Sequence, residues 1–237
     1  MNVKGIIFDK DGTLMEYEAF WVKIAKEAVA DTLVRIDADI ALAEKILSAS
    51  GYDGTNVAID GVMCCGTYSD FAAMMWAVLA DNGVSVDKEA LQKQIEKSYY
   101  ESFSKGDVIP ACDNLRNVLE NIKSKGIKIA LVTNDSVCGT EHCLKRLGIS
   151  HVFHRVYADD GVTPPKPDPY RIHQFCREEN ISPENIVVVG DTVADMLFAQ
   201  NAGATPIGVA KNDYNKRILE QFADVIDDIS KLNIYIK

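Results

Sequence analysis

Short runs of consecutive apolar residues recur along the chain, separated by segments in which apolar residues repeat at helical spacing. A run that is apolar at successive positions predicts a strand that is covered on both faces of its sheet. Alternation of such strands with helices is typical of a parallel, doubly wound α/β sheet. The predicted strands are residues 3–8, 128–133, 151–157, 185–190 and 205–210.

The alternation is interrupted once, between residues 15 and 107, where the pattern is helical throughout. Four helices are predicted there, at residues 17–34, 37–49, 68–81 and 87–103, with Asp87 as a cap of the last. We therefore expect an all-helical cap domain, residues 15–107, inserted into a Rossmann-like α/β core made of residues 1–14 and 108–237. Such an insertion could act as a lid over the sheet.

Composition restricts the partners and the location of the protein. The formal net charge of −10 argues against nucleic acid or an anionic membrane surface as a partner. The N-terminus leads directly into a strand, and no apolar run approaches the roughly 20 residues of a membrane span, so a cytoplasmic protein is expected. The six cysteines form no C-x-x-C pair and are expected to be reduced and mostly buried, and the four histidines suggest no joint metal site.

Polar side chains follow the predicted strands at the end where parallel sheets bind ligands. Asp9 and Asp11 follow the first strand, two positions apart, so that their side chains leave an extended segment on the same side. Two like charges in one place repel each other, and buried carboxylates are costly without a compensating partner. This pair therefore indicates a functional site.

Further polar residues follow the later strands. Asp191 and Asp195 are four residues apart and share a face if a helix begins near Thr192. With Asp9 they offer the hard oxygen ligands that Mg²⁺ prefers. Lys166 lies in a loop stiffened by prolines, which would hold its ammonium group in place. Thr133 and Asn134 end the second strand, where a hydroxyl and backbone N–H groups could bind phosphate.

Read in order, four segments resemble the four motifs of the haloacid dehalogenase-like hydrolase superfamily. They are FDKDGTL, LVTND, K-P-D-P and GDTVADMLFAQNAG. The helical insertion also resembles the cap of the branch that contains phosphoglycolate phosphatases and β-phosphoglucomutases. The resemblance covers the whole sheet domain.

The resemblance implies a magnesium-dependent phosphatase that acts on a small phosphorylated metabolite. Asp9 would be the nucleophile that forms an aspartyl-phosphate, and Asp11 the acid and base. Thr133 and Lys166 would hold phosphoryl oxygens. The cofactor Mg²⁺ would be bound by Asp9, the backbone carbonyl of Asp11 and Asp191, with Asp195 as a further ligand or as a partner of one.

Other functions remain open at this point. A phosphomutase would use the same nucleophile and acid, but the predicted cap loop at residues 58–70 contains no Lys or Arg to grip a second phosphate. A non-catalytic regulator that binds a phosphorylated metabolite is a more distant alternative. Response-regulator receivers share some of these residue types, but the helical insertion and GDTVADM do not fit them. The sequence does not indicate an oligomeric state.

Overall fold

The computed structural model describes residues 2–235 and divides into two compact units. One unit combines the residues up to Glu16 with those from Val108 onward, and the other is Tyr17–Asp107. No helix among residues 2–235 is long and apolar enough to cross a membrane.

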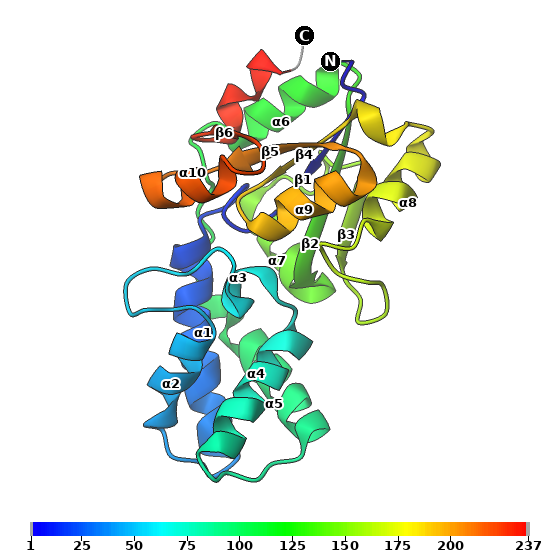
Figure 1. The fold of residues 1–237 in the computed structure, drawn as a ribbon. Coiled ribbons are helices and arrows are strands. Elements are labelled where there is room, and N and C mark those ends of the chain that lie inside the picture. Colours follow the sequence, from blue (N-terminus) through cyan, green and yellow to red (C-terminus); the bar gives the residue numbers. More distant parts are fainter. Residues whose placement is uncertain (1, 236–237) are drawn as a thin grey trace. The chain divides into compact units, whose positions relative to one another are not determined.

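The first unit is built on a six-stranded, entirely parallel sheet in the order β3-β2-β1-β4-β5-β6 (Figure 1). This sheet, with the separate helical unit, confirms the predicted fold class. The strands are β1 (Gly5–Phe8), β2 (Lys128–Ser136), β3 (Arg155–Asp159), β4 (Ile186–Gly190), β5 (Thr205–Val209) and β6 (Asp224–Ile226).

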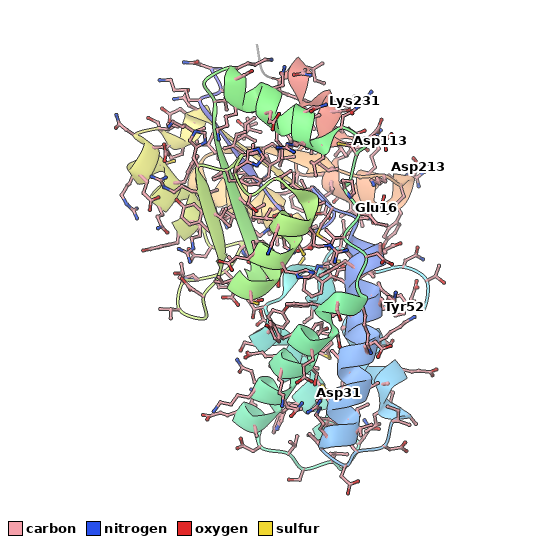
Figure 2. The ribbon with its side chains drawn as sticks, turned by 180° about the vertical axis from the view of Figure 1, so that it is seen from behind. Glu16, Asp31, Tyr52, Asp113, Asp213 and Lys231 are labelled. Atoms are coloured by element: carbon pink, nitrogen blue, oxygen red, sulfur yellow. The ribbon has the colours of Figure 1, made fainter. Side chains whose placement is uncertain are left out.

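Helices cover both faces of the sheet, which explains why its central strands are apolar at every position. One core layer joins the sheet to α6 (Leu115–Ser124), α7 (Val137–Leu147) and the 3₁₀ helix η3 (Ile229–Ile234), as seen from behind in Figure 2. The other joins it to α8 (Tyr170–Glu179) and α9 (Val193–Ala202), in front in Figure 1. The short helix η2 (Pro183–Asn185) precedes β4, and α10 (Asp213–Leu219) packs near β5.

The order of the strands determines where a ligand site can form. The chain runs from β1 to β2 and β3 on one side, then returns to place β4 on the other side of β1. The ends of β1 and β4 therefore flank the point at which the strand order reverses, which is where open α/β sheets bind their ligands. Asp9 directly follows β1, and Asp191 directly follows β4.

The second unit is helical and has its own aromatic core. Phe20, Trp21, Tyr99 and Phe103 are buried there, and the Trp21 ring lies within 6.2 Å of each of the other three ring centroids. A capping box at Thr67 and Asp70 begins one of its helices. The helices are α1 (Tyr17–Arg35), α2 (Leu42–Ala49), α3 (Val62–Cys65), α4 (Tyr68–Asp81) and α5 (Lys88–Ser102), followed by the 3₁₀ helix η1 (Phe103–Lys105).

Several sequence-based expectations were wrong in detail. Residues 151–154 form a turn, and the strand predicted at 151–157 instead runs over Arg155–Asp159. The strand β6 was not predicted, and α2 begins at Leu42 instead of residue 37. Of the six cysteines, all free, only Cys143 and Cys176 are buried, so the expectation that most are buried was also wrong.

Candidate active site

Asp9 is held at the end of the central strand. Its backbone N–H donates to the carbonyl of Val189 on β4 at 2.8 Å, which continues the sheet pairing one residue beyond Phe8. The side chain is buried, and its Oδ1 accepts a hydrogen bond from Lys166 Nζ at 2.5 Å. A buried carboxylate with a single lysine donor is thus placed at the carboxyl edge of the sheet.

Asp191 and Asp195 are positioned by the start of α9. Thr192 is the N-cap, and its hydroxyl accepts from the backbone N–H of Asp195 at 3.3 Å. Asp195 Oδ2 in turn accepts from the backbone N–H and the hydroxyl of Thr192, at 3.1 and 2.6 Å. This capping box orients the Asp195 carboxylate. The other oxygen of Asp195, Oδ1, accepts from Lys166 Nζ at 2.7 Å.

Gly12 allows Asp191 to approach the turn that follows β1. It has a φ of +82°, and a Cβ atom at this position would lie 2.0 Å from Asp191 Oδ2. Any side chain would therefore be both strained and in collision with the carboxylate. The hydroxyl of Thr13, which is buried, donates to Asp191 Oδ1 at 3.2 Å and fixes the carboxylate from the same turn.

Lys166 is clamped through its backbone by Asn134. The Asn134 side chain accepts from the backbone N–H of Lys166 at 3.0 Å and donates to its carbonyl at 3.3 Å. The sequence predicts that Asn134 binds phosphate, and in the structure its side chain also holds the backbone of Lys166 through these two bonds. Thr133 is buried, and its hydroxyl oxygen accepts from the backbone N–H of Asp135 at 3.1 Å.

The electrostatics of the cluster favour a bound cation. Burial, together with the carboxylates of Asp195 and Asp11, raises the pKa of Asp9 to about 7 despite the attraction of Lys166. Burial and the carboxylates of Asp9 and Asp195 likewise raise the pKa of Asp191 well above its ordinary value. Burial opposes the charge of Lys166, but Asp195 and Asp9 outweigh it and raise the lysine pKa.

The residues present fit a divalent metal ion. Asp9, Asp191 and Asp195 each offer a carboxylate oxygen, and these atoms all lie within 4.8 Å of one another. One lysine cannot balance three carboxylates, whereas Mg²⁺ prefers such oxygen ligands and completes its shell with water and substrate phosphate. Both Asp195 oxygens already accept hydrogen bonds, so Asp9 and Asp191 are the better placed direct ligands.

Two buried residues of this region, Lys10 and Asp135, were not predicted from the sequence. Lys10 lies between the two aspartates, and its Nζ is 2.8 Å from Asp11 Oδ1 and 2.9 Å from Asp135 Oδ2. Burial opposes the charge of Lys10, but Asp11 and Asp135 outweigh it and raise its pKa. The signal was a lysine in the middle of an otherwise acidic and apolar segment, opposite in side-chain direction to Asp9 and Asp11.

The fold and this arrangement of side chains define a class of hydrolase, and comparison with known proteins agrees. The model of the haloacid dehalogenase-like hydrolase family matches residues 3–203. The chain therefore belongs to the haloacid dehalogenase-like hydrolase family, as its motifs predicted.

Relatives of this chain support its assignment as a phosphatase. It is 30% identical over 145 residues to the phosphoglycolate phosphatase of Psychrobacter arcticus, a match that covers 60% of this chain and 63% of that protein. Its match to the phosphoglycolate phosphatase of Vibrio cholerae is 26% identical and covers 98% of this chain and 96% of that protein.

Solved structures share the fold. The crystal structure of a predicted phosphoglycolate phosphatase from Haemophilus somnus superposes with a TM-score of 0.73 at 20% identity, covering 100% of this chain and 99% of that one. That of a putative β-phosphoglucomutase from Thermotoga maritima gives 0.65 at 24% identity, with 98% of each chain covered.

Proposed function

We propose that the protein is a magnesium-dependent phosphatase that hydrolyses a small phosphate monoester through an aspartyl-phosphate on Asp9. The observation that carries this proposal is the placement of a buried Asp9 between Lys166 and the carboxylates of Asp191 and Asp195. Phosphoryl transfer depends on positioning and charge compensation more than on covalent machinery, and this cluster offers both. We also propose that the protein is cytoplasmic, as expected from its sequence.

In the first step, a carboxylate oxygen of Asp9 attacks phosphorus, and the bond between phosphorus and the leaving oxygen breaks. Asp11 donates a proton to that oxygen, so that a neutral alcohol departs. Lys166 and the hydroxyl of Thr133 hold phosphoryl oxygens. In the second step, Asp11 takes a proton from water as the water attacks phosphorus, which releases inorganic phosphate and restores Asp9.

The metal would be held by Asp9, the backbone carbonyl of Asp11 and Asp191, with Asp195 as support. When bound, Mg²⁺ would offset the negative charge of the carboxylates and of the phosphoryl group. Asp195 acts on the site through Lys166, whose ammonium it shares with Asp9. Asn134 holds the backbone of Lys166 next to the end of β2.

Purified protein assayed with 4-nitrophenyl phosphate and a panel of small phosphorylated metabolites tests this function. Phosphoglycolate is the first metabolite to include, because several relatives are named for it. We expect release of phosphate with Mg²⁺ and a loss of activity with a chelator. Activity that survives removal of the metal would contradict the cofactor, and inactivity across the panel would favour a regulator that only binds metabolites.

A phosphomutase is the second candidate, because a putative β-phosphoglucomutase shares the fold. A mutase must grip a second, non-reacting phosphate, for which Arg and Lys are the suitable side chains. Residues 58–70 of the helical unit contain neither. Several of the unit's cations already have partners within it: Arg35 bonds to Asp31 and Glu101, Lys26 to Tyr52, and Lys45 to Asn82.

We therefore expect net hydrolysis and no interconversion of hexose 1- and 6-phosphates. Each hexose phosphate is incubated with the protein, with and without a bisphosphate activator, while the isomers and free phosphate are followed together. If the isomer forms faster than phosphate is released, the protein is a phosphomutase and the proposed phosphatase function is wrong.

A further inference from the structure

Lys10 joins the proposed acid to a buried carboxylate on the neighbouring strand. Its Nζ lies 2.8 Å from Asp11 Oδ1, 2.9 Å from Asp135 Oδ2 and 3.7 Å from Cys143 Sγ of α7. An ammonium group has three donors and no acceptor. Lys10 therefore donates to Asp11 and Cys143 and forms a close ion pair with Asp135, although its side chain has no exposure to solvent.

Asp135 is a rigid anchor for this lysine. Its Oδ1 accepts from the backbone N–H of Ser136 at 2.7 Å, and the Ser136 hydroxyl caps α7 by accepting from the N–H of Gly139 at 3.1 Å. Gly139 leaves room for the carboxylate, because a Cβ atom there would lie 2.6 Å from both Asp135 oxygens. The start of α7 thus fixes Asp135, which in turn fixes Lys10.

We propose that Lys10 is a positioning residue that selects the oxygen on which Asp11 carries its transferable proton. Because the ammonium group only donates, the Oδ1 atom beside it must accept. When Asp11 is protonated, its proton therefore lies on Oδ2. The bond also restricts the rotation of the Asp11 side chain, so that Oδ2 meets the leaving oxygen in a single orientation.

This inference rests on the proposed function, in which Asp11 is the general acid, and it concerns only one part of the reaction. A poor leaving group such as an alkoxide needs the proton, whereas 4-nitrophenolate departs well without one. A residue that positions the acid should affect the alkyl ester more than the aryl ester. A purely structural ion pair between Lys10 and Asp135 would lower both activities together.

The test compares kcat/KM for 4-nitrophenyl phosphate and for the alkyl phosphate that the wild-type protein hydrolyses best, because this ratio reports formation of the phosphoenzyme and not its hydrolysis, which is common to both esters. Lys10→Met should lower kcat/KM for the alkyl ester about tenfold to a hundredfold more than for the aryl ester. Asp11→Asn sets the upper limit of this difference. Cys176→Ala is the control, because it truncates a buried thiol of α8 in the core layer on the other face of the sheet from α7, and it should lower stability alone.

Lys10→Met leaves Asp135 buried beside an apolar chain and could prevent folding. Two further variants address this: Lys10→Met with Asp135→Asn removes both charges, and Asp135→Asn alone removes the anchor with an isosteric side chain. The first should match Lys10→Met, and the second should give a smaller difference of the same sign. Equal losses on both esters in the folded variants would overturn the inference, whereas a wild-type protein inactive on both would refute the proposed function instead.

Discussion

Two aspartates, two positions apart in the sequence, have different charge partners. Asp9 is bonded to Lys166 from a distant loop, and Asp11 to Lys10 from its own segment. The two carboxylates therefore have different ammonium partners, which relieves the repulsion that two adjacent acids would otherwise cause. Separate partners also allow separate chemical roles.

Asp9→Asn and Asp11→Asn should consequently fail at different steps. Asp9→Asn removes the proposed nucleophile, so no phosphoenzyme should form and kcat should fall at least about a thousandfold. Asp11→Asn should still be phosphorylated by 4-nitrophenyl phosphate, but it should release phosphate slowly because no base activates water. Intact-protein mass spectrometry after rapid quenching measures the covalent species.

The wild-type protein trapped with beryllofluoride is the positive control for that measurement. Attachment of the phosphoryl group or its mimic to any residue other than Asp9 would contradict the assignment.

The residues of the candidate site were predicted to lie together because they follow strands. Asp9, Thr133 and Asp191 each end an apolar run, and the topology of a parallel sheet brings such ends together. The pairing of Lys10 with Asp135 was not predictable in this way, because it depends on how the turn after β1 meets the end of β2 and on the space left by Gly139. Local patterns carry no information on either.

At the scale of the elements, helix starts hold the site in place. The capping box of α9 uses Asp195 as its third helical residue, so the carboxylate that supports Lys166 also stabilises the helix.

Strand boundaries were less predictable than helix starts. The strand β3 begins four residues later than expected, because the apolar residues of 151–154 form a turn that packs against the core. The three-residue β6 is too short to show a pattern.

Thr192→Ala should lower both stability and activity, because Asp195 serves the cap of α9 and the position of Lys166. Loss of the cap should lower the free energy of unfolding by about 1 kcal/mol, and loss of the hydroxyl at Asp195 should reduce kcat roughly tenfold by freeing Lys166. Asn212→Ala removes the N-cap of α10, where the side chain accepts from Asn215, and should destabilise the protein without changing kcat. Denaturant unfolding and steady-state kinetics separate the effects, and unchanged kcat in Thr192→Ala would contradict a positioning role for Asp195.

For the whole molecule, the cluster of carboxylates couples folding to pH and to metal. The raised pKa of Asp9, about 7 in the folded protein, means that between about pH 4 and 7 the folded state holds more protons than the unfolded state. In the absence of metal, this group therefore makes the protein less stable as the pH rises through that range. Above it, the full cost of the ionised carboxylate remains.

Mg²⁺ should offset this cost and therefore stabilise the protein more at pH 8 than at pH 5. At a metal concentration a hundred times Kd, binding adds about 2.7 kcal/mol. Thermal unfolding at both pH values, with Mg²⁺ and with a chelator, measures the difference, and Asp191→Asn should reduce it. An equal shift at the two pH values would contradict a site built on these acids.

The central position of β1 has a consequence for biosynthesis. Residue 5 pairs with residues 128 and 186, so the strand that carries Asp9 leaves the ribosome long before either neighbour exists. The helical unit Tyr17–Asp107 has its own core and can form during that interval, because its contacts are closer in sequence. The nascent chain must therefore keep this apolar segment unpaired until β2 emerges and paired on one side only until β4 follows, so the proposed nucleophile reaches its final surroundings only after β4 and the start of α9 have been made.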